Sequence, residues 1–557
     1  MKLKKMFVFI MAILMLAACG NTGGTGAVNN TGVADVTTAA ASTTTQQTTT
    51  TAASTASSED TTSTSDSKPG GLPLVEEKAT LSVYWPADAT ILSMITDFNE
   101  NPTWQIIEEQ TNVHIEWFHG TKEQLQMMLN SGDMSDIVFI SDLAIYQGGG
   151  DKAIEDGAFL RLNELMEQYA PNYMGLLNGN PDLKRDAMSD VGNIVSFAML
   201  EDIVQGPFTG LGIRQDWLDD LGLSKPVTYD DWHTVLTAFK NEKNATAPLT
   251  IPADLVRDSG DNGELSGGFG LVAWYYQIDG QIKYGPIEPE FRDYVTLLSQ
   301  WYSEGLIDPD FNTRDGNGRD QLKYTNQAGA WLNTGFWLLE YHKRNAEDPN
   351  YTEVAVSSPV QKPGDIVNFR QSNRNFRGLH TVVTSSAADP VLAVRWLDNL
   401  YSEDNYILTN YGIEGQSYTI TDDGEYLFTD LIMQNPTMNV GQAMNVYLIH
   451  SGPMRRMWWR EAAGYTETEL DCYNVWESAT DKYVIPATTT FTADEGIIFS
   501  RIMSDVETYV LETMLAFITG TQSLDTFDAF QEQIKAMNID EAINIRQASL
   551  DRFNNRK

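Results

Sequence analysis

The alternation of short apolar runs with longer helical patterns between residues 80 and 140 most constrains what this chain can fold into. Three runs, Thr80–Trp85, Val113–Phe118 and Asp136–Ile140, have the length and the β-branched and aromatic content of strands. The segments between them, Asn101–Asn112 and Thr121–Asn130, have the spacing of helices. The third run is almost continuously apolar, which is typical of a strand buried in a parallel sheet. Strand, helix, strand, helix and strand in this order predict an α/β lobe.

The N-terminal segment MKLKKMFVFIMAILMLAACG has the parts of a secretory signal peptide. Its apolar run of about thirteen residues is too short to span a hydrocarbon core of about 30 Å as a permanent helix. Leu16–Cys19 resembles a bacterial lipobox, which implies that residues 1–18 are removed and that Cys19 carries lipid. Stable anchoring then follows if the cysteine holds two or more acyl chains. Ordinary signal cleavage with an unmodified Cys19 is the alternative.

Residues 19–75 are predicted to form a disordered tether behind the lipidated cysteine. Residues 37–67 contain twenty Ser or Thr among thirty-one, and no Lys or Arg follows the signal before Lys68. Such a segment has too little apolar surface to offset its chain entropy. About fifty flexible residues reach on the order of 40 Å, which would hold a folded body clear of a membrane.

The folded part is large and strongly acidic. With 557 residues and 42% hydrophobic content, the chain can bury more than one core. Its net charge is −39, and −42 once the three lysines of the signal are removed. This charge repels phosphate backbones, so nucleic acid is excluded as a partner class. The cysteines are Cys19 and Cys472, which do not make a disulfide scaffold.

The sequence carries none of the common catalytic signatures. It has no Gly-x-Ser-x-Gly elbow, no His-Glu-x-x-His zinc helix, no Gly-Lys dipeptide of a P-loop and no Gly-x-Gly-x-x-Gly fingerprint. Its six histidines are scattered along the chain. We therefore expect a protein that is not an enzyme and that uses no cofactor. A glycosidase, which needs only two suitably spaced carboxylates, is the alternative that stays open.

Several blocks of the sequence resemble the large extracellular solute-binding lipoproteins that serve ABC importers of oligosaccharides, the family 1 type. The blocks follow one another in the order of that family and cover nearly all of the chain after the tether. They are TLSVYW, TWQIIEEQTNVHIEWF, LQMMLNSGDMSDIVF, residues 212–240, 278–311, 410–420 and 508–520, and the closing residues 523–553.

This resemblance implies a two-lobed periplasmic-binding-protein-like α/β fold with hinge crossings and a ligand cleft between the lobes. We expect the first lobe to comprise residues 76–200 and 372–412, and the second to comprise residues 201–371 and 413–557 with C-terminal helices. The crossings are expected near Ile194–Gly210, Val354–Gln371 and Gly412–Gly415.

The resemblance also implies the function of a monomeric, lipid-anchored receptor on the extracellular face of a bacterial membrane. It would capture an oligosaccharide and deliver it to the transmembrane subunits of a permease. Two other functions stay open: a surface glycan-degrading enzyme and a peptide receptor of the same shape.

Related receptors often carry a calcium loop after the segment matched here by Thr237–Lys240. This chain continues as NEKNATAP, without the run of carboxylates. A loop that started at Asp258 would place Gly260 third and Phe269 twelfth, where a bidentate Glu is needed. We therefore expect no metal.

Aromatic side chains that could stack on sugar are the first candidates for the ligand site. Trp85 follows a strand, at the end where ligands of open α/β sheets bind, and Asp142 follows another strand in the same way. The family uses the stretch that contains Trp331 and Trp337 as a loop facing the cleft. Trp274 is a further candidate. For each Trp the alternative is packing in a core, and for Asp142 it is a helix cap.

A basic cluster interleaved with aromatics is the second group of candidates. Met454–Arg460 contains Trp458 and Trp459, with Arg374 and Arg377 upstream. Guanidinium groups could hold a uronate or a sulfate through paired hydrogen bonds. The alternative is that these arginines pair with the many carboxylates of the chain.

Overall fold

The computed structural model describes residues 71–86, 89–204, 206–253, 262–334, 350–458, 460 and 467–556. These residues belong to one compact unit. The signal peptide, Cys19 and the tether up to residue 70 lie outside the described residues, as do Trp337 and Trp459. Within the described ranges, no helix combines the length and the apolar content that a membrane span requires.

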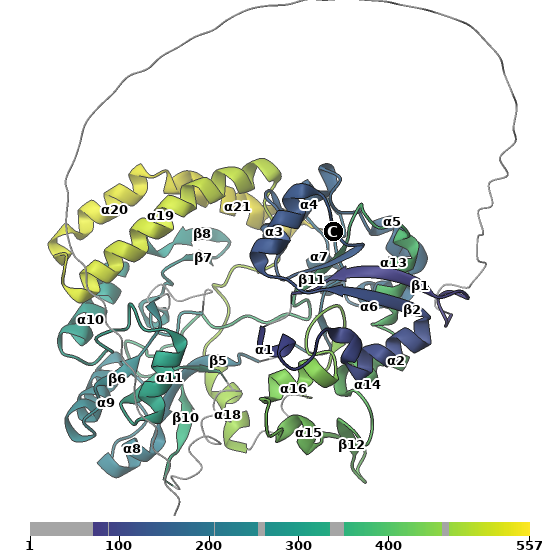
Figure 1. The fold of residues 1–557 in the computed structure, drawn as a ribbon. Coiled ribbons are helices and arrows are strands. Elements are labelled where there is room, and N and C mark those ends of the chain that lie inside the picture. The colour runs from purple at the N-terminus through teal and green to yellow at the C-terminus, as the bar shows by residue number, and fades with distance from the viewer. Residues whose placement is uncertain are drawn as a thin grey trace, which may run out of the picture. The chain divides into compact units, whose positions relative to one another are not determined.

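The first sheet has the strand order β11-β3-β1-β2 and contains the three strands predicted from the sequence (Figure 1). β1 (Ala79–Tyr84) pairs in parallel with β2 (Val113–Phe118) and with β3 (Ile137–Ile140). β11 (His380–Val383) runs antiparallel to β3 at the edge. The observed strand bounds differ from the predicted ones by at most one residue.

Local signals fix the two helices that connect these parallel strands. α2 (Pro102–Thr111) begins behind Asn101, whose side chain accepts hydrogen bonds from the first turn. α3 (Lys122–Ser131) begins with a capping box at Thr121 and ends at Gly132, whose φ of 75° suits glycine. Further helices of this lobe are α1 (Ala89–Leu92), α4 (Gly149–Glu155), α5 (Asn163–Tyr169), α6 (Pro171–Gly179), α7 (Pro181–Ala187), α13 (Pro390–Asn399) and α14 (Glu403–Tyr411).

The second sheet has the order β10-β5-β9-β6 and belongs to a separate core. β5 (Thr209–Arg214) lies between β10 (Glu353–Val356) and β9 (Ala328–Thr334) and is antiparallel to both, whereas β6 (Ala247–Thr250) is parallel to β9. The other elements of this lobe are α8 (Gln215–Leu221), α9 (Tyr229–Glu242), α10 (Phe291–Ser303), α11 (Gly316–Tyr324), the hairpin β7 (Tyr275–Ile278) and β8 (Gln281–Tyr284), α18 (Glu467–Trp476), α19 (Ala493–Thr519), α20 (Phe527–Ala536) and α21 (Ile539–Asn555).

The segment from residue 413 to residue 454 packs with the first lobe, although we expected it in the second. Its elements are the hairpin β12 (Tyr418–Ile420) and β13 (Tyr426–Phe428), α15 (Asp430–Met433) and α16 (Val440–Tyr447). The side-chain amide of Asn101 donates to the carbonyl groups of Asn445 and Leu448, at 3.0 Å each. Val446 and Met454 join the apolar core of the first lobe. These contacts between distant parts of the chain leave no mark in the local sequence pattern.

Candidate functional site

Three crossings between the lobes lie side by side. β4 (Leu200–Glu201) pairs in parallel with β14 (Arg455–Arg456), and Leu200 also forms a bridge with Phe376. The backbone N–H of Glu201 donates to the carbonyl of Asn375 at 2.7 Å. The third crossing therefore lies at β14, later in the chain than the expected turn at Gly412–Gly415. The first two crossings fall close to the predicted ranges.

Carboxylates pair with the arginines of these crossings. The Glu201 side chain has no exposed surface, and its Oε1 lies 3.3 Å from Arg377 Nε and 4.0 Å from Arg456 Nε. Beside it, Arg455 contacts Asp202 at 2.5 Å and Glu403 at 2.7 Å. Burial raises the pKa of the Asp202 carboxyl, and the hydrogen bond from Arg455 opposes this shift.

The predicted basic cluster is thus divided among several acidic partners. Arg374 lies 3.0 Å from Asp186, a carboxylate whose side chain is 3% exposed. Trp458 is buried, and its ring packs edge-on against Tyr473 at 5.2 Å. The alternative of pairing with carboxylates accounts for Arg374 and Arg377, and a direct ligand contact of these residues stays a prediction.

The carboxyl edge of the first sheet brings Trp85 and Asp142 to the ends of neighbouring strands. Trp85 continues the β1 ladder, because its N–H donates to the carbonyl of Phe118 at 2.9 Å. The alternation of a strand then turns its ring to the apolar face, where it stacks on Phe139 with the ring centres 4.6 Å apart. The ring is 6% exposed. Packing therefore accounts for the Trp85 environment.

Asp142 is exposed and caps a short helix, since its Oδ1 accepts from the Ala144 N–H at 2.9 Å. Nearby, His380 Nδ1 lies 2.8 Å from the Ser196 hydroxyl. Burial lowers the pKa of His380 to about 4, and the charge of Asp142 acts in the opposite direction. His380 is therefore neutral at physiological pH. Asp142 therefore acts as a helix cap, and its contact with a ligand stays a prediction.

The two described candidate tryptophans of the second lobe also make packing contacts. Trp331 lies within β9 rather than in a loop and is 1% exposed. Its Nε1 donates to Glu353 at 2.9 Å, and Lys323 lies over its ring at 5.3 Å. Trp274 is partly buried and packs edge-on against Tyr275. The Trp331 ring therefore presents no open face to a sugar, and contact of either tryptophan with a ligand stays a prediction.

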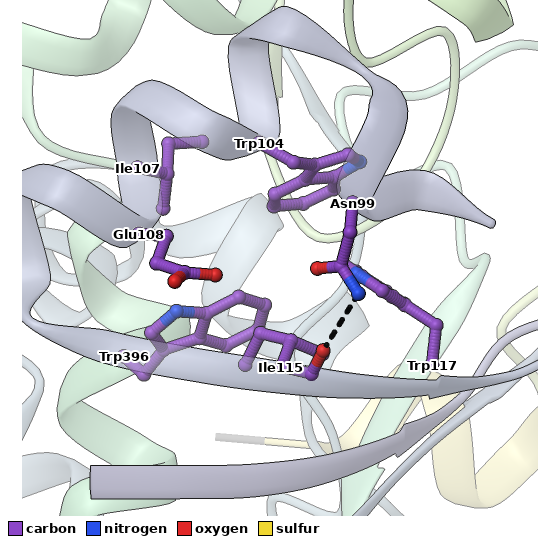
Figure 2. Close-up of a pocket in the computed structure, with 7 residues that line it drawn as sticks. All are labelled: Asn99, Trp104, Ile107, Glu108, Ile115, Trp117 and Trp396. Atoms are coloured by element: carbon purple, nitrogen blue, oxygen red, sulfur yellow. Dashed lines mark hydrogen bonds between the residues drawn. The ribbon is translucent and has the colours of Figure 1, made fainter. Parts of the chain in front are cut away.

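A small cavity lies between α2, β2 and α13 in the first lobe. Figure 2 shows the Trp104 and Trp396 rings on either side of it, with the Glu108 carboxylate beside them. The amide of Asn99 donates to the Ile115 carbonyl at 3.3 Å. The cavity has room for about one water molecule, which is too little for a sugar ring. Within the described ranges, no three His, Cys, Asp or Glu side chains gather as a metal site would require.

No family model matches the chain. Among curated proteins, it is 24% identical to the lipoprotein LipO of Bacillus subtilis over 366 residues, which cover 63% of this chain and 70% of LipO. It is 25% identical over 341 residues to FusA of Streptococcus pneumoniae, a fructooligosaccharide ABC transporter substrate-binding protein; this match covers 57% of the chain and 61% of FusA.

Solved structures match over a larger part of the chain. The alginate-binding protein AlgQ2 superposes with a TM-score of 0.69 and 25% identity, covering 86% of this chain and 99% of AlgQ2. A solute-binding protein of a Bifidobacterium longum infantis ABC transporter that binds HMO also gives 0.69, with 19% identity and coverage of 86% and 99%. The chain is therefore similar in sequence and in fold to solute-binding proteins of ABC importers. The predicted two-lobed α/β fold is confirmed, and the relatives of the chain are receptors rather than enzymes.

Two phenylalanines that were not predicted as site residues are exposed or partly exposed, one at the edge of the first sheet and one beside a crossing. Phe118 ends β2 at the carboxyl edge of the first sheet and is 50% exposed. Phe208 precedes β5, is partly exposed and has the Arg377 guanidinium 5.7 Å above its ring. The outward position of Phe118 could have been read from the alternation of buried and polar residues along Val113–Phe118.

Proposed function

We propose that this protein is a lipid-anchored extracellular receptor that captures an oligosaccharide and delivers it to the permease of an ABC importer. The observation that carries the proposal is the set of three adjacent crossings between two separate cores. In such an arrangement a few residues can absorb the rotation of one lobe against the other. FusA is named for fructooligosaccharide and AlgQ2 for alginate, so an oligosaccharide is the ligand class that the relatives favour.

The proposed mechanism is a shift of population by closure of the lobes. A ligand that contacts both lobes binds the closed form better than the open form, and this differential affinity moves the equilibrium. The backbone pairing of β4 with β14 would keep the crossings together during the rotation. The permease would then recognise the closed form.

The anchor is the part of this proposal that the sequence alone supports. A Cys19→Ser variant should lose its membrane attachment and keep its fold, because the tether separates residue 19 from the described unit. Growth in labelled fatty acid followed by fractionation tests this expectation. Absence of label from wild-type protein would show that Cys19 is not acylated.

A thermal-shift screen of the released Cys19→Ser chain tests the receptor function. A ligand at a hundredfold excess over its Kd should stabilise the folded form by about 2.7 kcal/mol, which raises the midpoint by several degrees. Each sample is then chromatographed to determine whether the sugar is intact. Cleaved sugar would show an enzyme, and a shift with peptides alone would show a peptide receptor.

A further inference from the structure

We infer that the oligosaccharide this protein captures is electrically neutral, and that polyuronates and sulfated glycans are not its ligands. The inference rests on the proposed function, and it specifies the ligand class for the site beside the crossings. Ligands of two-lobed proteins bind at the interface between the lobes, so the side chains of the crossings determine which charge a ligand can carry there.

The first argument is that the crossing arginines already have carboxylate partners. Arg377 and Arg456 share the buried carboxylate of Glu201, and Arg374 contacts the nearly buried Asp186. Taken together, the four arginines of the crossings, which include Arg455, face four carboxylates, those of Asp186, Glu201, Asp202 and Glu403. The set carries no net charge, so it offers little attraction to a further anion. A uronate that approached these arginines would also meet the Glu201 carboxylate.

The same pattern continues where α21 meets the first lobe. Arg552 Nε and Arg556 lie 2.7 Å and 2.6 Å from the buried carboxylate of Asp190, and Arg552 also contacts Glu495 at 2.5 Å. Arg185 lies 3.0 Å from Asp182. Arg374, Arg377, Arg455, Arg456, Arg552 and Arg556 therefore act as internal counter-ions in a chain of net charge −39.

Arg370 differs from these six arginines. Its Nη1 donates to the carbonyl of Gln371 at 3.1 Å, and among the described residues no carboxylate forms an ion pair with it. Any binding of an acidic glycan would therefore depend most on this side chain. An Arg370→Gln variant is therefore the control for binding of acidic oligosaccharides.

The second argument is that groups suited to a neutral sugar are present. Phe118 and Phe208 are exposed or partly exposed, and aromatic faces of this kind pack against the C–H side of a pyranose. The uncharged amide of Gln371 lies beside Phe208, because the Phe208 N–H donates to Gln371 Oε1 at 3.0 Å. Stacking and amide hydrogen bonds require no charge on the ligand.

The test is calorimetry of the released Cys19→Ser chain against two panels of equal chain length. One panel holds neutral fructo-, manno-, xylo- and galacto-oligosaccharides, and the other holds oligogalacturonate, oligoalginate and sulfated oligosaccharides. We expect binding within the neutral panel and at least about tenfold weaker binding of every acidic member, a difference of about 1.4 kcal/mol. Tighter binding of an acidic glycan that is lost in Arg370→Gln would overturn the inference and leave the receptor proposal standing. No binding by either panel would overturn both.

A charge variant makes the test specific to the crossings. Glu201→Gln keeps the shape of the side chain and removes one negative charge from beside Arg377 and Arg456. We expect this variant to bind acidic oligosaccharides about tenfold better than wild type, with the neutral ligand changed less than about twofold. Asp186→Asn, which frees Arg374, is the second variant in case Glu201→Gln does not fold. Unchanged acidic binding in a folded variant would show that the paired carboxylates do not set the ligand charge.

Discussion

The two lobes bury their polar groups in different ways. In the first lobe, Asp398 is 2% exposed and is held by neutral donors, the N–H of Tyr173 at 2.8 Å and the side chain of Asn172 at 2.8 Å. In the second lobe, the fully buried Glu353 accepts from the indole of Trp331 and from the Tyr351 hydroxyl, with the cation of Lys323 nearby. A buried carboxylate without a cation is costly in its charged form, so the first lobe should respond more strongly to pH.

The tryptophans differ in the same way. Trp85 lies among Phe98, Trp104, Trp117 and Phe139, in a cluster held by apolar and ring contacts. Its counterpart in the second lobe, Trp331, is fixed by a hydrogen bond to a charged group. An aromatic residue at a strand end is therefore weak support for a ligand site, because both kinds of core use such residues.

The largest expected effect is on the first aromatic cluster. Trp85→Ala should lower the free energy of unfolding by about 3–5 kcal/mol, since it removes a large ring from contacts on several sides. Urea denaturation measures this loss. A folded variant of unchanged stability that binds sugar more weakly would show instead that Trp85 acts as a ligand contact.

The second prediction concerns the pH response of the first lobe. Burial raises the pKa of Asp398 to about 6 from an ordinary value of 3.8, so the protonated carboxyl favours the folded state. Asp398 therefore contributes about 3 kcal/mol to the free energy of unfolding below about pH 4, and this contribution is lost as the pH rises through 6. Asp398→Asn should lack this loss.

The quantity to measure is the difference in unfolding free energy between wild type and Asp398→Asn at pH 4.5 and at pH 7.5. The lowered pKa of His380 makes stability rise with pH, and this effect cancels in the difference because both proteins contain His380. We expect the variant to gain stability relative to wild type as the pH rises. A difference that does not depend on pH would contradict the account of Asp398.

The smallest effect comes from a matched pair of substitutions. Trp331→Phe removes the indole N–H that donates to Glu353. Its free energy of unfolding should fall by about 1–3 kcal/mol more than the smaller ring volume alone would explain. Trp85→Phe removes no side-chain hydrogen bond that the structure shows, so its cost should be smaller. Denaturation of the two variants under the same conditions compares the lobes directly. Equal losses would remove the distinction between an apolar and a hydrogen-bonded tryptophan.

The sequence predicted the first sheet well and the site poorly, for physical reasons. The strands and helices between residues 80 and 140 depend on alternation and on caps such as Asn101 and Thr121, which act within a few residues. The partners of the crossing arginines are distant in sequence, as Arg374 and Asp186 are. The place of Trp85 depends on whether the ladder continues for one more residue, which the composition of the strand does not reveal.

Small-angle X-ray scattering of the released chain, with and without its neutral oligosaccharide, tests the central claim most directly. That claim is that two lobes joined by adjacent crossings close on an uncharged sugar. The account predicts that the radius of gyration falls when a neutral oligosaccharide saturates the protein, and that it does not change with an acidic oligosaccharide or a peptide at the same concentration. Saturation by a neutral sugar with an unchanged radius of gyration would contradict closure, and compaction by the acidic glycan alone would contradict the assignment of ligand charge.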